Sequence, residues 1–192
     1  MRIFSKQTNL RDQFTEMNLF VKTVILVLLH NVMDVQSRNL AREGTASQDS
    51  ESYPASNAID GEISGDLFSH TISAGPSAWW LLTLKNRALI REIKIYNRVD
   101  CCQDRIDGAT VWIGDNLIGG NYEGAVKVGT VQYEPGKNPY IFSGIDKKGT
   151  SVEIQGGPPT ESVPNKYVHL QEVKVYGSYC EIQAGKGCML GL

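Results

Sequence analysis

The sequence predicts an all-β fold, and three observations support this prediction. Short stretches of alternating apolar and polar residues recur, turn-forming residues separate them, and no long segment with helical periodicity follows residue 37. The 19 glycines and only 8% aromatic residues fit a turn-rich fold better than a bundle of long helices. Because we find no internal repeat and no linker, we expect one domain, built as a β-sandwich or barrel.

Alternating segments and turns follow one another in order. We predict five strands from the alternation, at 80–84, 93–97, 109–113, 126–128 and 152–154. Sequences rich in Gly, Pro, Asn and Asp lie between them, at 107–108, 119–120, 135–139 and 156–159. These residue types supply the backbone conformations that turns need.

A further alternating segment, at 168–175, contains an irregularity. The apolar positions of Val168–Leu170 and of Val173–Val175 are in opposite phase, and the slip falls across Gln171-Glu172. A β-bulge produces such a one-residue slip, and bulges often border functional sites. The alternative is two strands that meet at a corner. His169 alternates with its apolar neighbours, so we predict that it faces solvent.

The N-terminus has the plan of a secretory signal. A basic residue, an apolar run at 19–29 and small residues follow one another, with Val35 and Ser37 at the −3 and −1 positions of a cleavage site. A bilayer-spanning helix needs about twenty residues, which this run does not reach. We therefore predict a signal peptide at 17–37, after a polar extension at 1–16 that an upstream start codon would add, and a secreted, extracellular product without membrane association. A membrane anchor and an ordinary amphipathic helix are the alternatives.

The four cysteines, Cys101, Cys102, Cys180 and Cys188, all follow the predicted cleavage site. An oxidising compartment favours their pairing. Cys180 and Cys188 could close a small terminal loop. Adjacent residues have Cα atoms about 3.8 Å apart, whereas ordinary disulfides need about 4.4–6.8 Å, so a Cys101–Cys102 bond requires a strained ring. Cross-pairing of these two with the tail cysteines stays open.

The densest cluster of charged residues is 98–105. Arg98 and Arg105 flank the paired cysteines, Asp100 is placed to orient one guanidinium, and His70 lies upstream. Each arginine offers five donors and no acceptor. Two arginines and an imidazole in one pocket suit a neutral ligand that is rich in hydroxyl and ether oxygens. The alternative is a charged surface loop without a ligand.

This cluster resembles the signature of the F-type lectin (fucolectin) family. The signature is a His, a spacer, Arg-x-Asp, four residues, and Arg or Lys. Here 27 residues separate His70 from Arg98, one more than usual, and Arg98-x-Asp100-x4-Arg105 matches without gaps. The resemblance extends over 38–177, through Asn39-Leu40-Ala41, Asn57-Ala58-Ile59-Asp60-Gly61, His70-Thr71, Trp79-Trp80, Arg105-Ile106-Asp107-Gly108 and Glu172-Val173-Lys174-Val175-Tyr176-Gly177.

The resemblance implies an eight-stranded, discoidin-like jelly-roll β-sandwich at 38–180, followed by a Gly-rich tail at 181–192. It implies binding of α-L-fucose by His70, Arg98 and Arg105, with Asp100 as the orienting carboxylate. It also implies a vicinal Cys101–Cys102 disulfide against the apolar edge of the sugar, which leaves Cys180 to pair with Cys188. Weaker candidates for an apolar wall beside the sugar are Tyr53, Leu67 and Phe68.

The family also carries a calcium ion, which requires hard oxygen ligands. Carried over by motif, the ligands are Asn57, Glu62 and Gln171 through carbonyl oxygens and Asp60 and Glu172 through carboxylates. The chain departs from the family pattern in three ways. The loop at 61–69 is shorter, the family's serine ligand is missing, and Phe68 and Gln171 replace the two cysteines of a family disulfide.

We therefore predict a non-enzymatic, secreted lectin that binds fucosylated glycans. Its acidic residues are scattered, so no carboxylate pair suits glycoside hydrolysis. A net charge of −2 gives no basic excess for nucleic-acid binding. One pocket per chain favours a homo-oligomer or clustered ligands. The alternatives are a discoidin-like extracellular protein-interaction domain with a decayed sugar site, and a carbohydrate-binding module paired with an enzyme on another chain.

Overall fold

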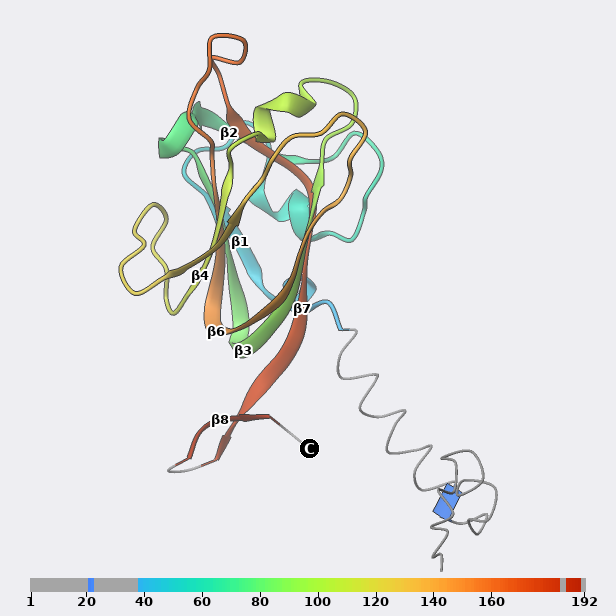
Figure 1. The fold of residues 1–192 in the computed structure, drawn as a ribbon, viewed down its shortest axis with the longest axis vertical. Coiled ribbons are helices and arrows are strands. Elements are labelled where there is room, and N and C mark those ends of the chain that lie inside the picture. The colour runs from blue at the N-terminus through green and yellow to red at the C-terminus, as the bar shows by residue number, and fades with distance from the viewer. Residues whose placement is uncertain (1–20, 23–37, 184–185, 191–192) are drawn as a thin grey trace, which may run out of the picture. The chain divides into compact units, whose positions relative to one another are not determined.

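The computed structural model describes residues 21–22, 38–183 and 186–190, with side chains up to Cys180 (Figure 1). The chain divides into two units, 1–36 and 37–192, and the architecture below is that of the second. The predicted signal peptide lies outside the described residues apart from Val21 and Lys22, which are helical. No helix in the described part of the chain is long and apolar enough to cross a bilayer.

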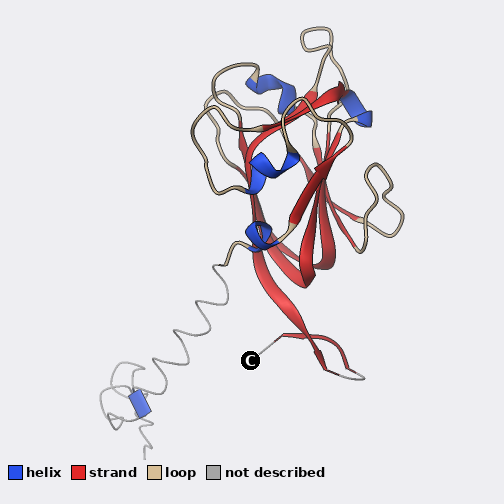
Figure 2. Cartoon of the chain, turned by 180° about the vertical axis from the view of Figure 1, so that it is seen from behind, coloured by secondary structure: helices blue, strands red, loops and turns tan. Residues whose placement is uncertain are grey.

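The second unit consists of antiparallel strands joined by loops and short 3-10 turns (Figure 2), as the sequence predicts. The strands are β1 (Thr45–Gln48), β2 (Ser69–Ala74), β3 (Trp79–Asn97), β4 (Thr110–Gly114), β5 (Val126–Thr130), β6 (Tyr140–Gln155), β7 (Tyr167–Gln183) and β8 (Lys186–Leu190). The 3-10 turns are η1 (Leu40–Glu43), η2 (Ala55–Ile59), η3 (Gly75–Ser77) and η4 (Gln103–Ile106). The all-β prediction is confirmed.

Two long strands, β3 and β6, each pass through both layers of a sandwich. The first half of β3 pairs with β1 and with the second half of β6, which continues to β4 and β5. The second half of β3 pairs with β7 and with the first half of β6, and β7 continues to β2. The register of β3 with β6 shifts between Thr83 and Ala88, where β3 changes layer.

The separate strands predicted at 80–84 and 93–97 are therefore wrong in one respect, because both belong to β3. Exposed Lys85, Asn86 and Arg87 interrupt the alternation between them. Those residues lie where β3 bends from one layer to the other. Three consecutive polar residues are typical of a turn between two strands. In this protein they form a bend within a single strand.

The core fills the space between the two layers. Trp80 is fully buried and its indole Nε1 donates to the carbonyl of Ala55 at 3.0 Å, so its polar atom is satisfied. Full burial of one large apolar side chain contributes about 1.5–3 kcal/mol. The alternating positions of the predicted strands supply most of the other buried side chains: Leu82, Ile93, Ile95, Val111, Ile113, Val152, Ile154, Val173 and Val175.

A β-bulge lies in β7, as the phase slip indicates. Asn97 pairs with Leu170 and Tyr96 pairs with Glu172, which leaves Gln171 as the extra residue. The prediction that His169 faces solvent is wrong, because its exposed fraction is only 2%. The prediction from alternation assumes that one face of the strand is exposed to solvent. Here β2 pairs with β7 and places an aromatic ring beside His169.

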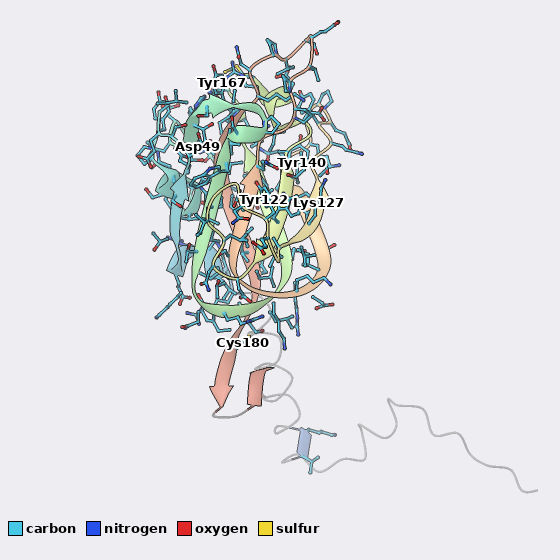
Figure 3. The ribbon with its side chains drawn as sticks, turned by 90° about the vertical axis from the view of Figure 1, so that its left-hand side faces the viewer. Asp49, Tyr122, Lys127, Tyr140, Tyr167 and Cys180 are labelled. Carbon is cyan, nitrogen blue, oxygen red and sulfur yellow. The ribbon has the colours of Figure 1, made fainter. Side chains whose placement is uncertain are left out.

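The end of the chain is more regular than a Gly-rich tail suggests. β7 continues to Gln183 and pairs with β8, and this hairpin extends from the end of the sandwich opposite η4 (Figure 1). Tyr167, the first residue of β7, and Cys180, three residues before its end, are labelled in Figure 3. Cys180 is disulfide-bonded. The side chain of Cys188, its predicted partner, lies outside the described residues.

Candidate functional site

The structure brings together the three residues predicted to contact the sugar. His70 lies on β2, Arg98 follows β3, and Arg105 lies in η4. Burial lowers the pKa of His70, and the guanidinium charges of Arg98 and Arg105 lower it further. Residues that are 28 and 35 positions apart from His70 in the sequence thus meet at one end of the sandwich.

Two aromatic rings hold this arrangement. The Arg98 guanidinium carbon lies 4.3 Å from the ring centroid of Phe68, and that of Arg105 lies 5.0 Å from the ring centroid of Tyr167. The His70 ring lies between them, with centroid distances of 6.2 Å to Phe68 and 5.1 Å to Tyr167. Each guanidinium is thereby positioned by a cation–π contact. Sequence reasoning missed Tyr167, because a tyrosine that begins a strand carries no motif.

Asp100 orients Arg98, as predicted. The guanidinium donates from Nε to Oδ1 at 2.7 Å and from a terminal nitrogen to Oδ2 at 2.5 Å. The hydrogen bonds from Arg98 hold the pKa of Asp100 well below its usual range, so the carboxylate is ionised at neutral pH. This bidentate pair uses two of the five guanidinium donors, and the others are left for a ligand.

Three amide side chains hold the loop that carries the two arginines, and the one from Asn97 is buried. Asn97 donates from Nδ2 to the carbonyl of Gln103 at 2.8 Å, and Gln103 donates from Nε2 to the carbonyl of Val99 at 2.8 Å. Asn138 accepts from the backbone N–H of Asn97 and donates back to its carbonyl. These bonds cross the loop in both directions, so its shape is preformed. The signature contains neither asparagine, and sequence reasoning missed both.

Cys101 and Cys102 differ from the prediction. Both are free cysteines, and the neighbouring Cys102 raises the pKa of the Cys101 thiol. The predicted vicinal disulfide is therefore not formed in this structure. Cys102 has a φ of 57°, a left-handed conformation that a non-glycine residue adopts only under local constraint. The strained ring that a bond between neighbours requires is thus replaced by a tight turn with two thiols.

The protonation of His70 follows from its contacts. Its Nδ1 lies 2.5 Å from the carbonyl of Thr71, and a carbonyl only accepts, so Nδ1 carries the proton. Burial, and then Arg98 and Arg105, lower the pKa of His70. The ring is therefore neutral at pH 7 and its Nε2 is an acceptor. The site offers one acceptor beside two cationic donors, which suits a hydroxyl group that donates and accepts at once.

His169 lies behind His70 and was not predicted as part of the site. The two residues are direct cross-strand partners, and their rings stack with centroids 5.7 Å apart. Burial lowers the pKa of His169 to about 3, so this ring is neutral. Neither of its ring nitrogens has a hydrogen-bond partner among the described residues.

The predicted calcium ligands lie around η2 and the bulge of β7. Asp60 ends η2, and its Oδ1 accepts from the N–H of Glu62 at 2.8 Å. Asn57 donates from Nδ2 to the carbonyl of Phe68, and Gln171 donates from Nε2 to that of Leu67. Both amides therefore keep an oxygen that can accept.

Glu172 tests whether these residues fit a cation. It is fully buried; Oε2 accepts from the N–H of Gly61 at 3.2 Å, whereas Oε1 has no partner in the part of the chain that the structure describes. Burial raises the pKa of Glu172 to about 7, and Asp60 adds to the shift. The described residues contain no group of three or more His, Cys, Asp or Glu side chains that could hold a metal. A set of two carboxylates with amide and backbone oxygens fits Ca²⁺, which accepts such ligands.

The fold and site together define a non-enzymatic carbohydrate-binding domain of the lectin type. The chain belongs to the NedA-like, galactose-binding domain family (F5_F8_type_C_2), whose family model matches residues 57–154. Among its relatives is Fucolectin from Anguilla anguilla, which is 37% identical over 89 residues; the match covers 41% of this chain and 56% of the relative. Pentraxin fusion protein from Xenopus laevis is 26% identical over 155 residues, which cover 76% of this chain and 35% of the relative.

A solved structure agrees with these relatives. The fucolectin from Morone saxatilis serum superposes with a TM-score of 0.65 at 28% identity, and covers 78% of this chain and 51% of that chain. The lectin domain of Lectinolysin complexed with Lewis B antigen has a TM-score of 0.62 at 24% identity, which shows a shared fold. This chain spans about a third of the length of the first curated relatives, 35% of the pentraxin fusion protein and 36% of Fucolectin-3 from Anguilla japonica.

Proposed function

We propose that this chain is a secreted lectin that binds terminal α-L-fucose. One observation carries the proposal: a neutral imidazole with a free acceptor nitrogen lies beside two guanidinium groups, each positioned on an aromatic ring. The fucolectins among its relatives support the choice of sugar and, with the serum origin of one of them, the secreted location.

The chemistry of fucose matches this donor and acceptor set. One hydroxyl can donate to Nε2 of His70 while it accepts from Arg98, and the ring oxygen can accept from Arg105. The methyl group needs an apolar neighbour. Tyr53 and Leu67 are exposed beside the buried Phe68, and the Tyr53 and Phe68 ring centroids are 5.0 Å apart. These side chains can cover the methyl group, whereas Phe68 itself carries Arg98.

Titration calorimetry with methyl α-L-fucoside tests the sugar site. Charge-assisted hydrogen bonds contribute about 1.5–3 kcal/mol, so we expect Arg98→Ala and Arg105→Ala each to weaken binding about ten- to a hundredfold. Arg87→Ala is the matched control, because Arg87 lies on β3 outside the site and forms an ion pair with Asp115. D-galactose is titrated in parallel, because the family model that matches this chain describes a galactose-binding domain. If the folded protein binds no fucoside, or both site variants bind like wild type, the fucose site is wrong and a protein-interaction role takes its place.

We also propose that Ca²⁺ binds between Asn57, Asp60, Glu62, Gln171 and Glu172. Oε1 of Glu172 is buried and has no hydrogen-bond partner within the described ranges, which supports this proposal, because an uncompensated buried carboxylate is costly. Calcium here would stabilise the η2 turn against β7. None of its proposed ligands belongs to the fucose-contacting set, so its role is structural.

Calcium removal gives the second test. A ligand at a hundred times its Kd stabilises the folded state by about 2.7 kcal/mol, so chelation should lower the Tm by about 5–10 °C. Glu172→Gln should abolish this response, and in chelator it should melt no lower than wild type because it removes the buried charge. Glu123→Gln, an exposed residue away from the site, is the control. An unchanged melting curve in chelator, with no calcium by elemental analysis, would exclude the ion.

A further inference from the structure

The two layers of the sandwich leave an open edge between β5 and β6. β5 is the last strand of one layer, and residues 140–149 of β6 pair only with β3 among the described residues. Between these two edges lies a hollow of about 450 Å³ that contains none of the residues assigned to fucose or calcium. Its volume lies within the range of about 300–1,000 Å³ that is typical of small-molecule sites.

Irregular backbone makes both edges unsuitable for pairing with a further strand. In β5, Val128 is an extra residue in the register with β4. In β6, the register with β3 shifts across 144–146, where Gly144 and Asp146 have φ values of 66° and 46°. Bulges of this kind interrupt the row of backbone groups that an added strand would need. The hollow therefore depends on its side chains for binding, which disfavours an extended peptide as its occupant.

The walls of the hollow are mainly apolar. Val126 is 43% exposed and Ile141 is 53% exposed. The ring of Phe142 reaches across to β5, since a Cβ on Gly129 would lie 2.7 Å from it. Exposed apolar surface that gathers in one place often marks a binding site. The apolar side chains that line the hollow are Val126, Val128, Ile141, Phe142 and Ile145.

Two lysines line the hollow, and no acidic residue does. Lys127, labelled in Figure 3, and Lys147 are exposed, and neither forms an ion pair in the part of the chain that the structure describes. Lys127 lies 6.0 Å from the centroid of the Trp112 ring. Asp146, which precedes Lys147, pairs with Arg91 at 3.8 Å. Two ammonium groups beside apolar walls complement a ligand that has an anionic head and an apolar chain.

We propose that this hollow binds an anionic amphiphile with a single alkyl chain, of which a fatty acid is the simplest example. The carboxylate would lie beside Lys127 and Lys147, and the chain would lie against the apolar walls of Val126 and Ile141. The hollow shares no residue with the proposed fucose site. The protein would therefore bind a second class of ligand, independently of glycans.

Titration calorimetry with decanoate below its critical micelle concentration tests the proposal. Butyrate keeps the head without the long chain, and decanol keeps the chain without the charge. We expect no detectable binding of butyrate, and decanol should bind about three- to twentyfold more weakly than decanoate, as two exposed ion pairs allow. From octanoate to decanoate, affinity should increase about two- to fourfold with each methylene group that leaves water.

Variants of the two lysines test the head group. Lys127→Gln and Lys147→Gln should each weaken decanoate binding about two- to fivefold and leave decanol binding unchanged. Lys85→Gln is the matched control, because Lys85 is an exposed lysine of β3 that does not line the hollow. If both site variants bind decanoate like wild type, or if decanoate and decanol bind equally, the proposal is wrong.

A variant of the apolar wall tests the chain. Ile141→Glu replaces an exposed apolar side chain with a charge of the same sign as the ligand, so decanoate binding should be lost. Ile72→Glu is its control, because Ile72 is 64% exposed and lies on β2, away from the hollow. Melting curves of all variants establish that they are folded. An equal loss in Ile72→Glu would show non-specific association and would overturn the site.

Vesicles of phosphatidylglycerol distinguish a single bound chain from a membrane surface. If the folded protein binds the vesicles but not decanoate, this face contacts a bilayer, and the proposed single-chain site is wrong. Fucoside titration of the same samples reports on the sugar site separately. We expect decanoate to leave fucoside affinity unchanged, and failure of either ligand to bind would not remove the other.

Discussion

At the scale of single residues, the site depends on contacts that fix side chains rather than on the side chains alone. Arg98 is held by Asp100 from one direction and by the Phe68 ring from another. His70 is held in one tautomer by the Thr71 carbonyl. The donors and the acceptor are therefore oriented before a ligand binds, so binding costs little side-chain conformational entropy.

Asp100→Asn tests this orientation. The asparagine keeps the shape but loses the charge and one acceptor, so Arg98 is held less firmly. We expect fucoside affinity to fall about three- to tenfold, less than in Arg98→Ala, with the free energy of unfolding unchanged within about 0.5 kcal/mol because the pair is partly exposed. Calorimetry and urea unfolding of the same samples provide both numbers. A loss as large as that of Arg98→Ala would show that Asp100 itself contacts the sugar.

At the scale of elements, the loop between β4 and β5 is anchored to the outer face of the sheet by one buried carboxylate. Glu153 on β6 accepts at Oε1 from the N–H of Gly120 at 2.9 Å and from the Tyr122 hydroxyl at 2.7 Å. Tyr122 stacks on Trp112 with ring centroids 4.4 Å apart. Oε2 of Glu153 has no partner among the described residues.

Glu153→Gln should therefore stabilise the protein at neutral pH. Burial raises the pKa of Glu153, so the folded state binds more protons than the unfolded state, and wild-type stability decreases as pH rises through the folded-state pKa. The glutamine carbonyl can still accept from Gly120 and Tyr122. We expect a gain of about 1 kcal/mol at pH 7 that shrinks toward pH 4, measured by urea unfolding. A loss at pH 7 would mean that the ionised carboxylate has a favourable partner.

At the scale of the whole molecule, the sandwich encloses the imidazole ring of His169, and the surrounding core gives this ring no hydrogen bond from the described residues. His169 is buried and neutral behind the ring of His70, and neither of its ring nitrogens has a hydrogen-bond partner in the described part of the chain. An unpartnered buried polar group costs about 1–3 kcal/mol. The stability of the fold as a whole is therefore sensitive to the protonation of this one residue.

His169→Leu should raise stability and flatten its pH dependence. The pKa of His169 is about 3 in the folded state against about 6.5 when unfolded, so between these values the unfolded chain binds the extra proton. Wild-type stability should thus fall as pH decreases from 6.5, by up to about 1.4 kcal/mol per pH unit. The leucine variant should lack this component and gain about 1–2 kcal/mol at pH 7. The free energy of unfolding of both proteins is measured by urea titration between pH 4 and pH 7. If it falls equally with decreasing pH in both, His169 is not the source of the pH dependence.

Local pattern was sufficient for several features, because each depends on neighbours in the sequence. Alternation at Ile93–Ile95 and Val152–Ile154 identifies strands, since the side chains of a strand alternate between faces. The slip across Gln171-Glu172 identifies the bulge for the same reason. The spacing Arg98-x-Asp100 predicts their ion pair, because both lie on one loop.

Other features were decided only by tertiary structure, because they depend on residues that are distant in the sequence. Whether His169 is exposed to solvent or buried depends on β2, which lies about a hundred residues earlier in the sequence. Whether Tyr167 belongs to the site depends on where η4 places Arg105. The Lys166–Asp107 contact, which ties the segment before β7 to the end of η4, joins residues 59 positions apart. Alternation determines which residues can form strands, whereas packing between layers determines which polar side chains are enclosed and which meet a ligand.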